Sequence, residues 1–220
     1  MTSGSTWHAA GLLPLFNMSY ATSHIHDYSV KFYKKLEKEM NTDIGFKVVG
    51  NLRMAQTQDR MDEFMLYSST ADTVNIPYEW KNPKQIKERW PLVYSEDLKG
   101  AIYHPTDGYI NPADLTQAIA RSARSNDVKI ERKTQADSFY WDGNSWHVQC
   151  SKMFEKGGNL LVSQEKVTYI AEHVVTATGN HVQNTSKLLN TKIAAIPVEH
   201  QYIVTEEDPK LIEYRKNNDE

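Results

Sequence analysis

Apolar residues recur every three or four positions in the stretch 24-HIHDYSVKFYKKLEKEM-40, near the start of the chain. This spacing places them on one side of an α-helix, which has about 3.6 residues per turn. Lysine and glutamate fill many of the positions between them and would form a solvated outer face. The pattern therefore predicts an amphipathic helix over 24–40 with a buried stripe of Ile25, Tyr28, Phe32, Leu36 and Met40.

The following segments predict a strand and two short helices. The stretch 45-GFKVVGNLRMAQ-56 reads as a strand with a glycine-centred irregularity. Thr57 can cap a helix over 59–67, because a threonine side chain accepts a hydrogen bond from a free amide of the first helical turn. Asn82, followed directly by a proline, opens another short helix, which we expect to end before Pro91.

The clearest helix signal lies in 105-PTDGYINPADLTQAIARSARS-125. Asn111 is a favoured N-cap residue, and the proline after it suits the first helical position. Asp114 places a negative charge in the first turn, where the helix dipole favours it. The apolar face consists mainly of small residues, which would allow close packing on a sheet; its members are Leu115, Ala118, Ile119 and Ala123.

The second half of the chain predicts β-structure. Asp142-Gly143-Asn144 indicates a hairpin turn within 137–151, and the glycine pair at 157–158 indicates another turn. Strands joined by such short turns are antiparallel. Further strands are predicted at 128–133, 160–164, 166–179 and 196–206. Helices and strands together predict an α+β fold, in which helices flank a mixed or antiparallel sheet.

Composition narrows the class of protein. The 220 residues carry 25 Lys and Arg against 28 Asp and Glu, a formal net charge of −3, so we expect no nucleic-acid partner. Mean hydropathy is −0.62 and no stretch approaches the roughly 20 apolar residues of a membrane span, so no membrane association is expected. Residues 1–20 lack the basic start of a secretory signal. With Cys150 as its single cysteine, the chain forms no internal disulfide, which fits a reducing compartment.

Two stretches suggest chemistry. The stretch 174-VVTATG-179 ends in small residues and a glycine, which lets the backbone approach a bound group, although most such strand ends are only turns. In 3-SGSTWHAAGL-12, small residues surround His8, and Trp7 adds a flat apolar wall. An imidazole in such a place can be a general base, a metal ligand, a nucleophile or a partly buried loop histidine. These residues alone leave all four interpretations open.

Two other pairs predict packing instead of chemistry. His24 and His26 lie two positions apart on a predicted helix, so their side chains point in different directions and we expect no metal site there. Trp141 and Trp146 flank the predicted hairpin turn, where they would pack across the strands. We therefore expect no metal ligands in this chain.

Four stretches resemble one family of enzymes. The run 2-TSGSTWHAAGLLPLF-16 resembles the segment that carries covalently bound flavin in the dimethylglycine and sarcosine dehydrogenases, members of the D-amino-acid-oxidase-like superfamily of FAD-dependent oxidoreductases. The same family is resembled, in the same order and at similar spacing, by 45-GFKVVGNLRMA-55, 106-TDGYINPADLTQAIARSAR-124 and 196-IPVEHQYIVT-205. The resemblance therefore covers nearly the whole chain.

The resemblance implies that the N-terminal run holds the flavin. His8 would be joined through a ring nitrogen to the 8α-methyl carbon of FAD, with Ser5, Thr6, Trp7 and Gly11 around the cofactor. The neutral imidazole is the form that attacks, so we expect the loop to shield His8 from water.

The resemblance also implies roles for residues further along the chain. Thr178 and Gly179 would lie by the FAD phosphates, and the backbone around Ala136 would face the adenine. His200 and Tyr202 would lie on the substrate side as catalytic residues, where a histidine could place or deprotonate the amine.

The implied reaction is the oxidation of a small N-methyl amine such as dimethylglycine or sarcosine. Hydride would pass from the methyl carbon to flavin N5 and leave an iminium, which is hydrolysed to formaldehyde or captured by tetrahydrofolate. The sequence identifies neither the amine nor the electron acceptor. The implied location is the cytoplasm, or the mitochondrial matrix if the organism is a eukaryote.

The sequence departs from the family in three ways. We find no GxGxxG dinucleotide fingerprint and no folate-binding region, and the usual histidine of the DGxI run is Tyr109 here. We therefore expect an internal fragment: a substrate-domain portion with part of an FAD-binding α/β domain that lacks its N-terminal Rossmann unit. Segments 1–44 and 105–190 would belong mainly to the FAD domain, and 45–104 and 191–220 mainly to the substrate domain.

Such a fragment would not hold FAD stably or be active alone, because the Rossmann turn that receives the pyrophosphate would be missing. An alternative is a non-catalytic relative, such as the regulatory subunit of pyruvate dehydrogenase phosphatase, which resembles the same family. The chain would then be an interaction protein. The retained WHAAG run favours the enzyme.

Overall fold

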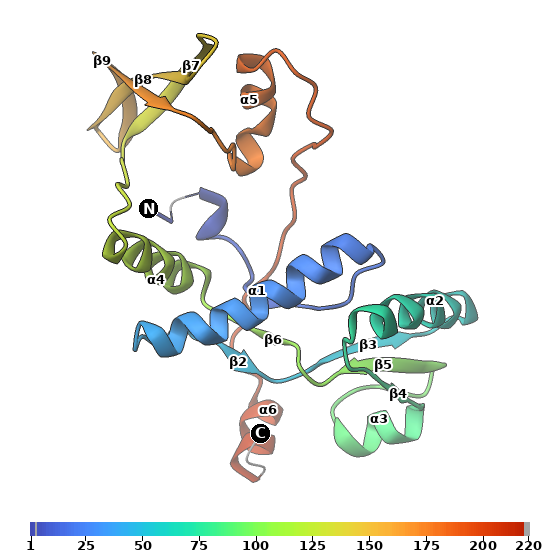
Figure 1. Cartoon of the computed structure of the whole chain (residues 1–220). Coiled ribbons are helices and arrows are strands. Elements are labelled where there is room, and N and C mark those ends of the chain that lie inside the picture. The colour runs from blue at the N-terminus through green and yellow to red at the C-terminus, as the bar shows by residue number, and fades with distance from the viewer. Residues whose placement is uncertain (3, 218–220) are drawn as a thin grey trace. The chain divides into compact units, whose positions relative to one another are not determined.

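The computed structural model describes residues 1–2 and 4–217, and the chain divides into two compact units, Met1–Arg132 and Lys133–Glu220. The first unit contains η1 (Gly4–Thr6), β1 (Leu12–Leu13), α1 (Tyr20–Glu39), β2 (Lys47–Val48), β3 (Asn51–Ala55), α2 (Gln58–Val74), β4 (Glu79–Lys81), α3 (Pro83–Arg89), β5 (Gly100–His104), β6 (Gly108–Tyr109) and α4 (Pro112–Ser125) (Figure 1). The second contains β7 (Thr134–Trp141), β8 (Trp146–Lys156), β9 (Asn159–Ala171), η2 (Gly179–His181), α5 (Val182–Leu188) and α6 (Pro209–Asn217).

Side-chain caps begin three helices of the first unit where the sequence predicts them. Thr57 Oγ1 accepts a hydrogen bond from the Arg60 amide at 3.2 Å, at the start of α2. Asn82 forms a capping box with Gln85 at the start of α3. Asn111 accepts hydrogen bonds from two amides of the first turn of α4. The helices predicted over 59–67, before Pro91 and after Asn111 are therefore confirmed, although α2 continues to Val74.

The helix predicted over 24–40 exists, and its predicted buried stripe is right at Leu36 and Met40 but wrong at the other three positions. It begins earlier, at Tyr20, behind the N-cap Ser19. Ser23, Val30 and Leu36 are its buried residues, because these positions face Leu15, α2 and α4. Ile25, Tyr28 and Phe32 lie on the outer side, where the rings of Tyr28 and Phe32 stack with centroids 6.4 Å apart. Apolar residues thus extend around more of this helix than the face that its neighbours cover.

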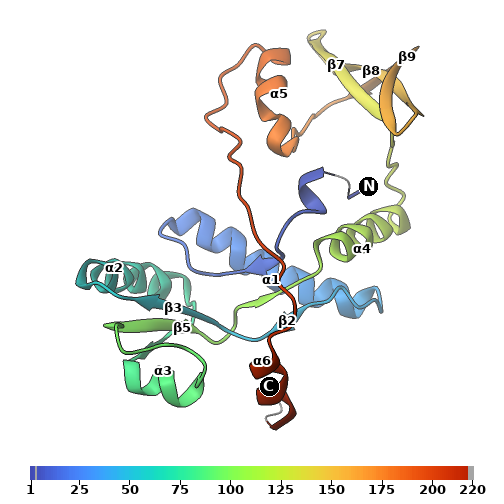
Figure 2. The same cartoon turned by 180° about the vertical axis from the view of Figure 1, so that it is seen from behind.

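One three-stranded antiparallel sheet, in the order β3-β5-β4, is covered on both faces. α2 and α3 lie on opposite sides of it (Figure 1; Figure 2). Alternate residues of β5 therefore meet different helices: Ile102 packs with Phe64 and Tyr67 of α2, whereas Ala101 packs with Ile86 of α3. As a result, all five residues of β5 are buried.

The other sheet of the first unit, β1-β6-β2, consists of two-residue antiparallel strands. Beside it, α1 and α4 share a core of Leu36, Ile44, Ile110, Leu115 and Ala118. Ile119, predicted to face this core, is 39% exposed, and Ala120 is buried in its place. The break predicted in 45–56 is confirmed, because β2 ends at Val48 and β3 starts at Asn51.

The second unit is built on a meander of three antiparallel strands, β7-β8-β9. Both predicted turns are confirmed: Asp142 accepts hydrogen bonds from the Asn144 and Ser145 amides in the first, and Gly157 and Gly158 form the second. Register shifts interrupt the ladder after Ala136 and after Ser151.

Two strand predictions were wrong, and a third, over 166–179, is confirmed only as far as Ala171. Residues 128–133 have no regular structure, and the strand begins at Thr134. β9 ends at Ala171, so 172–179 continues without pairing. Residues 196–206 form no strand either, and Ile196, Ile203 and other apolar side chains there are more than four-fifths exposed. A strand requires a regular ladder to a neighbouring strand, and none of these segments forms one within the described residues.

Candidate functional site

The N-terminal run begins as a short helical turn followed by an open loop. Ser5 and Thr6 lie in η1, and the Ala9 amide donates to the Thr6 carbonyl at 3.4 Å. Trp7 is 66% exposed and His8 is also exposed. The expected shielding of His8 is therefore not found in the described residues, because the loop around it carries mainly small side chains.

A groove of about 380 Å³ lies between Trp7 and the start of α4. Tyr109, Ile110 and Pro112 line its other side. The Ala113 and Asp114 amides donate hydrogen bonds to the Asn111 side chain, so they are not available to an anionic ligand. The groove therefore offers mainly a flat apolar surface next to the His8 loop.

Gly11 is required by chain packing. Its φ is +73°, and a Cβ there would lie 2.1 Å from the Ile110 carbonyl oxygen. The Ile110 amide donates to the Gly11 carbonyl at 2.8 Å, which brings the two backbones together. The predicted contact of Gly11 with the flavin stays a prediction.

A buried polar cluster in the first unit joins the residues after β1 to α2, β3, β5 and the connection between β5 and β6. The sequence did not predict this cluster. Asp107 is 1% exposed, and both of its carboxylate oxygens lie 3.2 Å from the Leu15 amide, which donates to them. The Tyr67 hydroxyl lies 3.0 Å from His104 Nε2 and 3.4 Å from the Leu15 carbonyl oxygen. Arg53 completes the cluster, with its guanidinium 4.3 Å from the centre of a neighbouring phenylalanine ring.

Burial controls the charge states in this cluster. Desolvation raises the pKa of Asp107 to about 6, against the opposing effects of the Leu15 hydrogen bond and Arg53. Desolvation, with a smaller contribution from Arg53, lowers the pKa of His104 to about 4, so this histidine is neutral at pH 7. It also raises the pKa of Tyr67. The cluster therefore holds one titratable carboxyl group among neutral partners and a single arginine.

In the second unit, a groove of about 890 Å³ brings together two predicted cofactor residues that are distant in sequence. Ala136 contributes from β7, and Thr178 contributes from the segment before η2. Thr178 is held by a 2.8 Å hydrogen bond between its hydroxyl and that of Thr185, which is buried. Gly179, next along the chain, has a φ of +53° and open space where a Cβ would lie.

The two sides of this groove differ in chemistry. Phe139, Met153 and Leu160 give the sheet side an apolar surface, whereas His181, Asn184 and Lys187 give the helical side hydrogen-bonding groups and a positive charge. The sequence offered little signal for these three residues, because their shared face depends on how η2 and α5 lie against β7.

The predicted catalytic residues lie outside regular structure. His200 and Tyr202 are exposed in the segment between α5 and α6, and Tyr202 retains 51% of its accessible surface. No described hydrogen bond joins their side chains. Their catalytic role stays a prediction.

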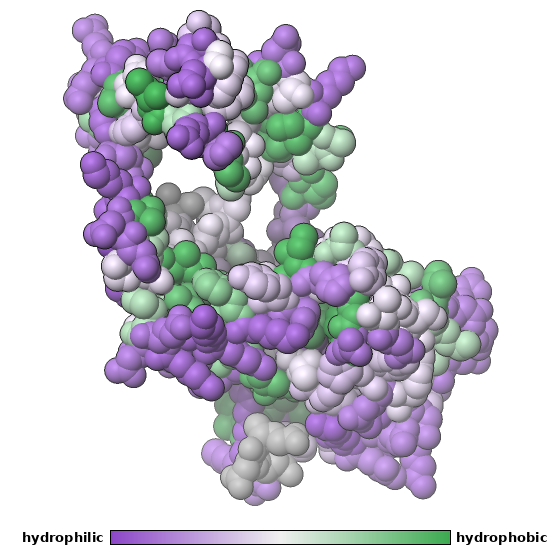
Figure 3. All heavy atoms as spheres, viewed as in Figure 1, coloured by the Kyte–Doolittle hydropathy of each residue, from purple (hydrophilic) through white to green (hydrophobic). Residues whose placement is uncertain are grey.

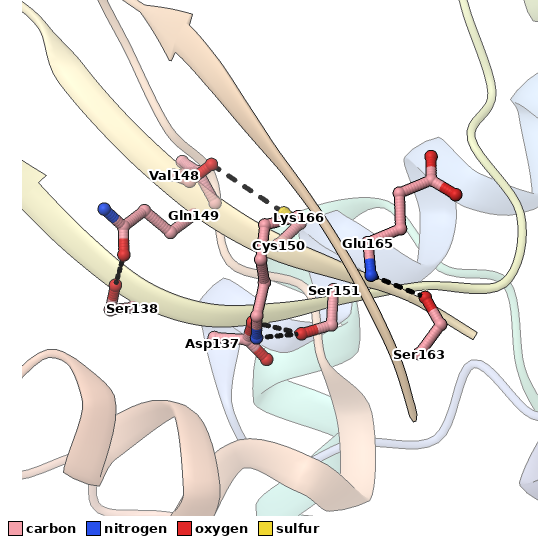
Figure 4. Close-up of polar contacts among 9 residues, drawn as sticks. All are labelled: Asp137, Ser138, Val148, Gln149, Cys150, Ser151, Ser163, Glu165 and Lys166. Atoms are coloured by element: carbon pink, nitrogen blue, oxygen red, sulfur yellow. Dashed lines mark hydrogen bonds and ion pairs between the residues drawn. The ribbon is translucent and has the colours of Figure 1, made fainter. Parts of the chain in front are cut away.

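Three strands of the second unit contribute a polar cluster that resembles a serine–lysine pair (Figure 4). Lys166 Nζ lies 2.8 Å from an Asp137 carboxylate oxygen, and Ser151 donates to the same carboxylate. Ser151 is fully buried, and its hydroxyl also accepts a hydrogen bond from Lys166. Asp137 lies on β7, Ser151 on β8 and Lys166 on β9, so these contacts join all three strands of the sheet. The cluster is therefore a clamp between strands.

Among the residues that the structure describes, no group of three or more His, Cys, Asp or Glu side chains is arranged so that it could hold a metal ion. This includes His24, whose ring packs edge-on against Tyr20 with centroids 4.5 Å apart.

Comparison with known families settles the class of protein. The family model described as "FAD dependent oxidoreductase" (DAO) matches residues 1–219. The chain belongs to this family.

Relatives within and near the DAO family include enzymes and a regulator. Mitochondrial dimethylglycine dehydrogenase of Rattus norvegicus is 33% identical over 96% of this chain, but the chain spans only 23% of that protein. The mitochondrial pyruvate dehydrogenase phosphatase regulatory subunit of Mus musculus is 31% identical over 93% of the chain and 22% of its own length. L-proline dehydrogenase from P. horikoshii has the same fold, with a TM-score of 0.70 and 21% identity over 86% of this chain and 47% of that one. The predicted α+β fold is thereby confirmed.

The residues present fit the cofactor of the DAO family. FAD combines an apolar adenine, a charged pyrophosphate and a flat isoalloxazine. The groove of the second unit pairs an apolar side with Lys187 and hydrogen-bonding groups, and the open space at Gly179 leaves room for a close backbone approach. The groove beside Trp7 supplies a flat apolar surface. Each groove, taken by itself, therefore offers residues that match one part of the cofactor.

Proposed function

We propose that this chain forms cofactor-holding and substrate-side parts of an FAD-dependent dehydrogenase that acts on a small N-methyl amine. The observation that carries the proposal is the groove in which Ala136 and Thr178 meet, beside Gly179. These residues were assigned to FAD from the sequence, and a shared groove with an apolar and a cationic side supports that assignment.

Particular residues would hold the cofactor in this proposal. Thr178, Gly179 and Lys187 would lie by the pyrophosphate, and Ala136 by the adenine. Ser5, Thr6, Trp7 and Gly11 would surround the isoalloxazine, and His8 would be joined to it covalently. FAD, when bound, supplies an acceptor for two electrons and the hydrogen of an N-methyl C–H bond.

The substrate side would be formed by His200 and Tyr202. An amine gives up hydride readily only when its nitrogen lone pair is free, so a neutral imidazole at His200 would take the ammonium proton, and the Tyr202 hydroxyl would orient the amine. Tetrahydrofolate would capture the one-carbon product in the complete protein, since without it the product is released as formaldehyde.

The relatives support a location and a substrate class for this proposal. The rat relative is named as a mitochondrial dehydrogenase of dimethylglycine, so we propose a methylated amino acid as substrate and, in a eukaryote, the mitochondrial matrix as location. No described helix is both long and apolar enough to span a bilayer.

A second candidate function is regulation without catalysis. It is favoured by the pyruvate dehydrogenase phosphatase regulatory subunit, whose identity to this chain is close to that of the dehydrogenase. Turnover of dimethylglycine or sarcosine by the protein would exclude this function. Bound flavin without turnover of any N-methyl amine would favour it.

Covalent flavin tests the proposal directly. The protein that the gene encodes is expressed in the presence of FAD, denatured in acid and separated on a gel, where covalent flavin fluoresces. We expect a fluorescent band that His8→Ala abolishes and His24→Ala retains. No band in the wild type would refute the tether, and a band that persists in His8→Ala would refute the choice of residue.

A further inference from the structure

We infer that Asp107 is a positioning residue for flavin attachment: it holds the backbone at Leu15 and thereby fixes the base of the loop that carries His8. The role of His8 rests on the proposed function. The contacts of Asp107 lie entirely within the first unit and stand without it.

The His8 loop is tied at its base to one short segment, residues 107–110. The Ile110 amide donates to the Gly11 carbonyl at 2.8 Å, and β1 then pairs with β6, with Leu12 opposite Tyr109. The Leu15 amide donates to the Asp107 carboxylate. These ties follow one another along the chain, and the tie to Asp107 is the one made by a side chain.

Both backbone groups of Leu15 are held by buried side chains from elsewhere in the unit. Asp107 binds the amide, and the Tyr67 hydroxyl lies within reach of the carbonyl. The arrangement that satisfies these groups has His104 Nε2 donating to Tyr67 and Tyr67 donating to Leu15. Leu15 lies beyond the end of β1, so the side chains replace a strand partner there.

Asp107 is itself fixed by its backbone. Its carbonyl accepts hydrogen bonds from the Val49 amide at 3.1 Å and the Gly50 amide at 2.8 Å. The next residue, Gly108, leaves no room to shift, because a Cβ there would lie 1.9 Å from the Lys47 carbonyl oxygen. A carboxylate on a rigid backbone sets the position of whatever it binds, here the end of the His8 loop.

The buried carboxyl group of Asp107 lowers the stability of the folded protein at pH 7. The charged or titratable neighbours are Arg53 from β3, His104 from β5 and Tyr67 from α2, with Tyr78 near Tyr67. Of these, only Arg53 is positively charged at pH 7, and desolvation dominates its attraction, so the pKa of Asp107 is raised. Uncharged residues of similar size commonly stabilise such sites. A group that lowers stability where it stands is a candidate for a functional role.

Attachment of the flavin provides a chemical readout of loop position. One bond would form between a His8 ring nitrogen and the 8α carbon; the N–H and C–H bonds would break, and dioxygen would take up the two protons and two electrons as hydrogen peroxide. A displacement of about 1 Å in a reacting group can slow such a step by about a hundredfold. A looser loop should therefore attach flavin more slowly even in a fully folded protein.

The test compares Asp107→Asn with wild type in the full protein that the gene encodes. Asparagine keeps the shape and one acceptor oxygen, but it removes the charge and replaces the second oxygen that accepts from the Leu15 amide with an NH2 donor. We expect attachment at least about tenfold slower, faster hydrogen exchange at the Leu15 amide, and a melting temperature at pH 7 equal to or above that of wild type. A merely structural role would instead lower stability and attachment together. Asp97→Asn makes the same charge change at an exposed site of the first unit and should alter none of the three.

The outcomes separate this role from the proposed function. Unchanged attachment and unchanged Leu15 exchange in Asp107→Asn would overturn the positioning role. Attachment that falls only as far as stability falls would also overturn it. If wild type attaches no flavin, the proposed tether fails, whereas Leu15 exchange still decides whether Asp107 anchors the loop.

Discussion

The two larger sheets of this molecule have the same number of strands and the same antiparallel pairing, but they differ in what covers them. β5, the centre of the first, is buried along its whole length between α2 and α3. β9 is an outer strand of the second sheet, and none of its described residues is buried. Its apolar residues Leu160, Val162 and Ile170 are at least half exposed. Figure 3 shows hydrophobic side chains open to the surface where Figure 1 places β7 to β9.

The difference shows that pairing alone does not build a core. In the first of these sheets, α2 lies between β3 and β4 along the chain and α3 lies between β4 and β5, so both helices fold directly onto the sheet. In the second unit, three strands follow one another through short turns, and no helix lies between them. We therefore expect the first sheet to contribute most to the free energy of unfolding and the second sheet to provide a surface for binding.

Truncation in each sheet should give the largest contrast. Ile102→Ala removes a fully buried side chain from β5 and should cost about 3–4 kcal/mol of unfolding free energy, because it leaves a cavity. Ile170→Ala removes a side chain that is 65% exposed and should cost less than about 1 kcal/mol. Urea unfolding of the two variants measures both values. Similar losses would mean that the second sheet is buried in the folded protein.

Acid should also separate the two units, because the pKa values of Asp107 in the first and Asp142 in the second are shifted in opposite directions. Asp107 has its pKa raised from 3.8 to about 6, so the folded state binds its proton more tightly; its stabilising effect is present below pH 3.8 and is lost as pH rises towards 6. The loss should be about 3 kcal/mol and absent in Asp107→Asn.

Asp142 in the second unit supplies the opposite case. A hydrogen bond from His147, aided by the Ser145 and Asn144 amides, lowers its pKa to about 2. Its stabilising effect is therefore present above pH 3.8 and lost as pH falls through 2. Unfolding free energies of Asp107→Asn and Asp142→Asn between pH 2 and 7 measure both slopes. Slopes of the same sign would contradict the different burial of the two carboxyl groups.

Glycine replacement should give a smaller difference. Gly11→Ala brings a Cβ against the Ile110 carbonyl at a φ of +73° and should cost about 1–3 kcal/mol. Gly143→Ala in the hairpin of the second sheet meets only open space, so backbone strain is its single cost and the loss should be smaller. Thermal unfolding of both variants tests this order, and the reverse order would contradict it.

The clamp of the second sheet should matter least. Lys166 has 63% of its side chain exposed, so water and salt screen its contact with Asp137. Lys166→Ala should cost at most about 1 kcal/mol, and less in high salt. Lys156→Ala, at an exposed end of the same sheet, is the matched charge control. A loss well above that of the control in high salt would mean that the clamp is shielded from solvent.

Local signals made much of the first unit predictable. Thr57, Asn82 and Asn111 cap helices through bonds to residues two or three positions away, so the necessary information is contiguous in the sequence. The hairpin at Asp142 is predictable for the same reason. The strand expected at 196–206 fails because a strand depends on a partner, which residue type alone does not supply.

The candidate site was only partly predictable. The resemblance named Ala136 and Thr178, and the structure brings both to one groove. It gave no sign of the cluster around Leu15, because Asp107 lies 92 positions away from that residue and reads in the sequence as part of a Pro-Thr-Asp-Gly turn. Partners that meet only through the tertiary fold leave no local pattern.

The outer edge of β9 has a practical consequence for work with this chain. Within the part of the chain that the structure describes, no strand pairs with the outer side of β9, and a long open edge of this kind is a template for another copy. The run Leu160-Leu161-Val162 adds apolar side chains to that edge. The nearby charges of Glu165 and Lys166 interrupt the run on one side only. Purified protein should therefore be handled dilute, because self-association through this edge would become more severe as it is concentrated.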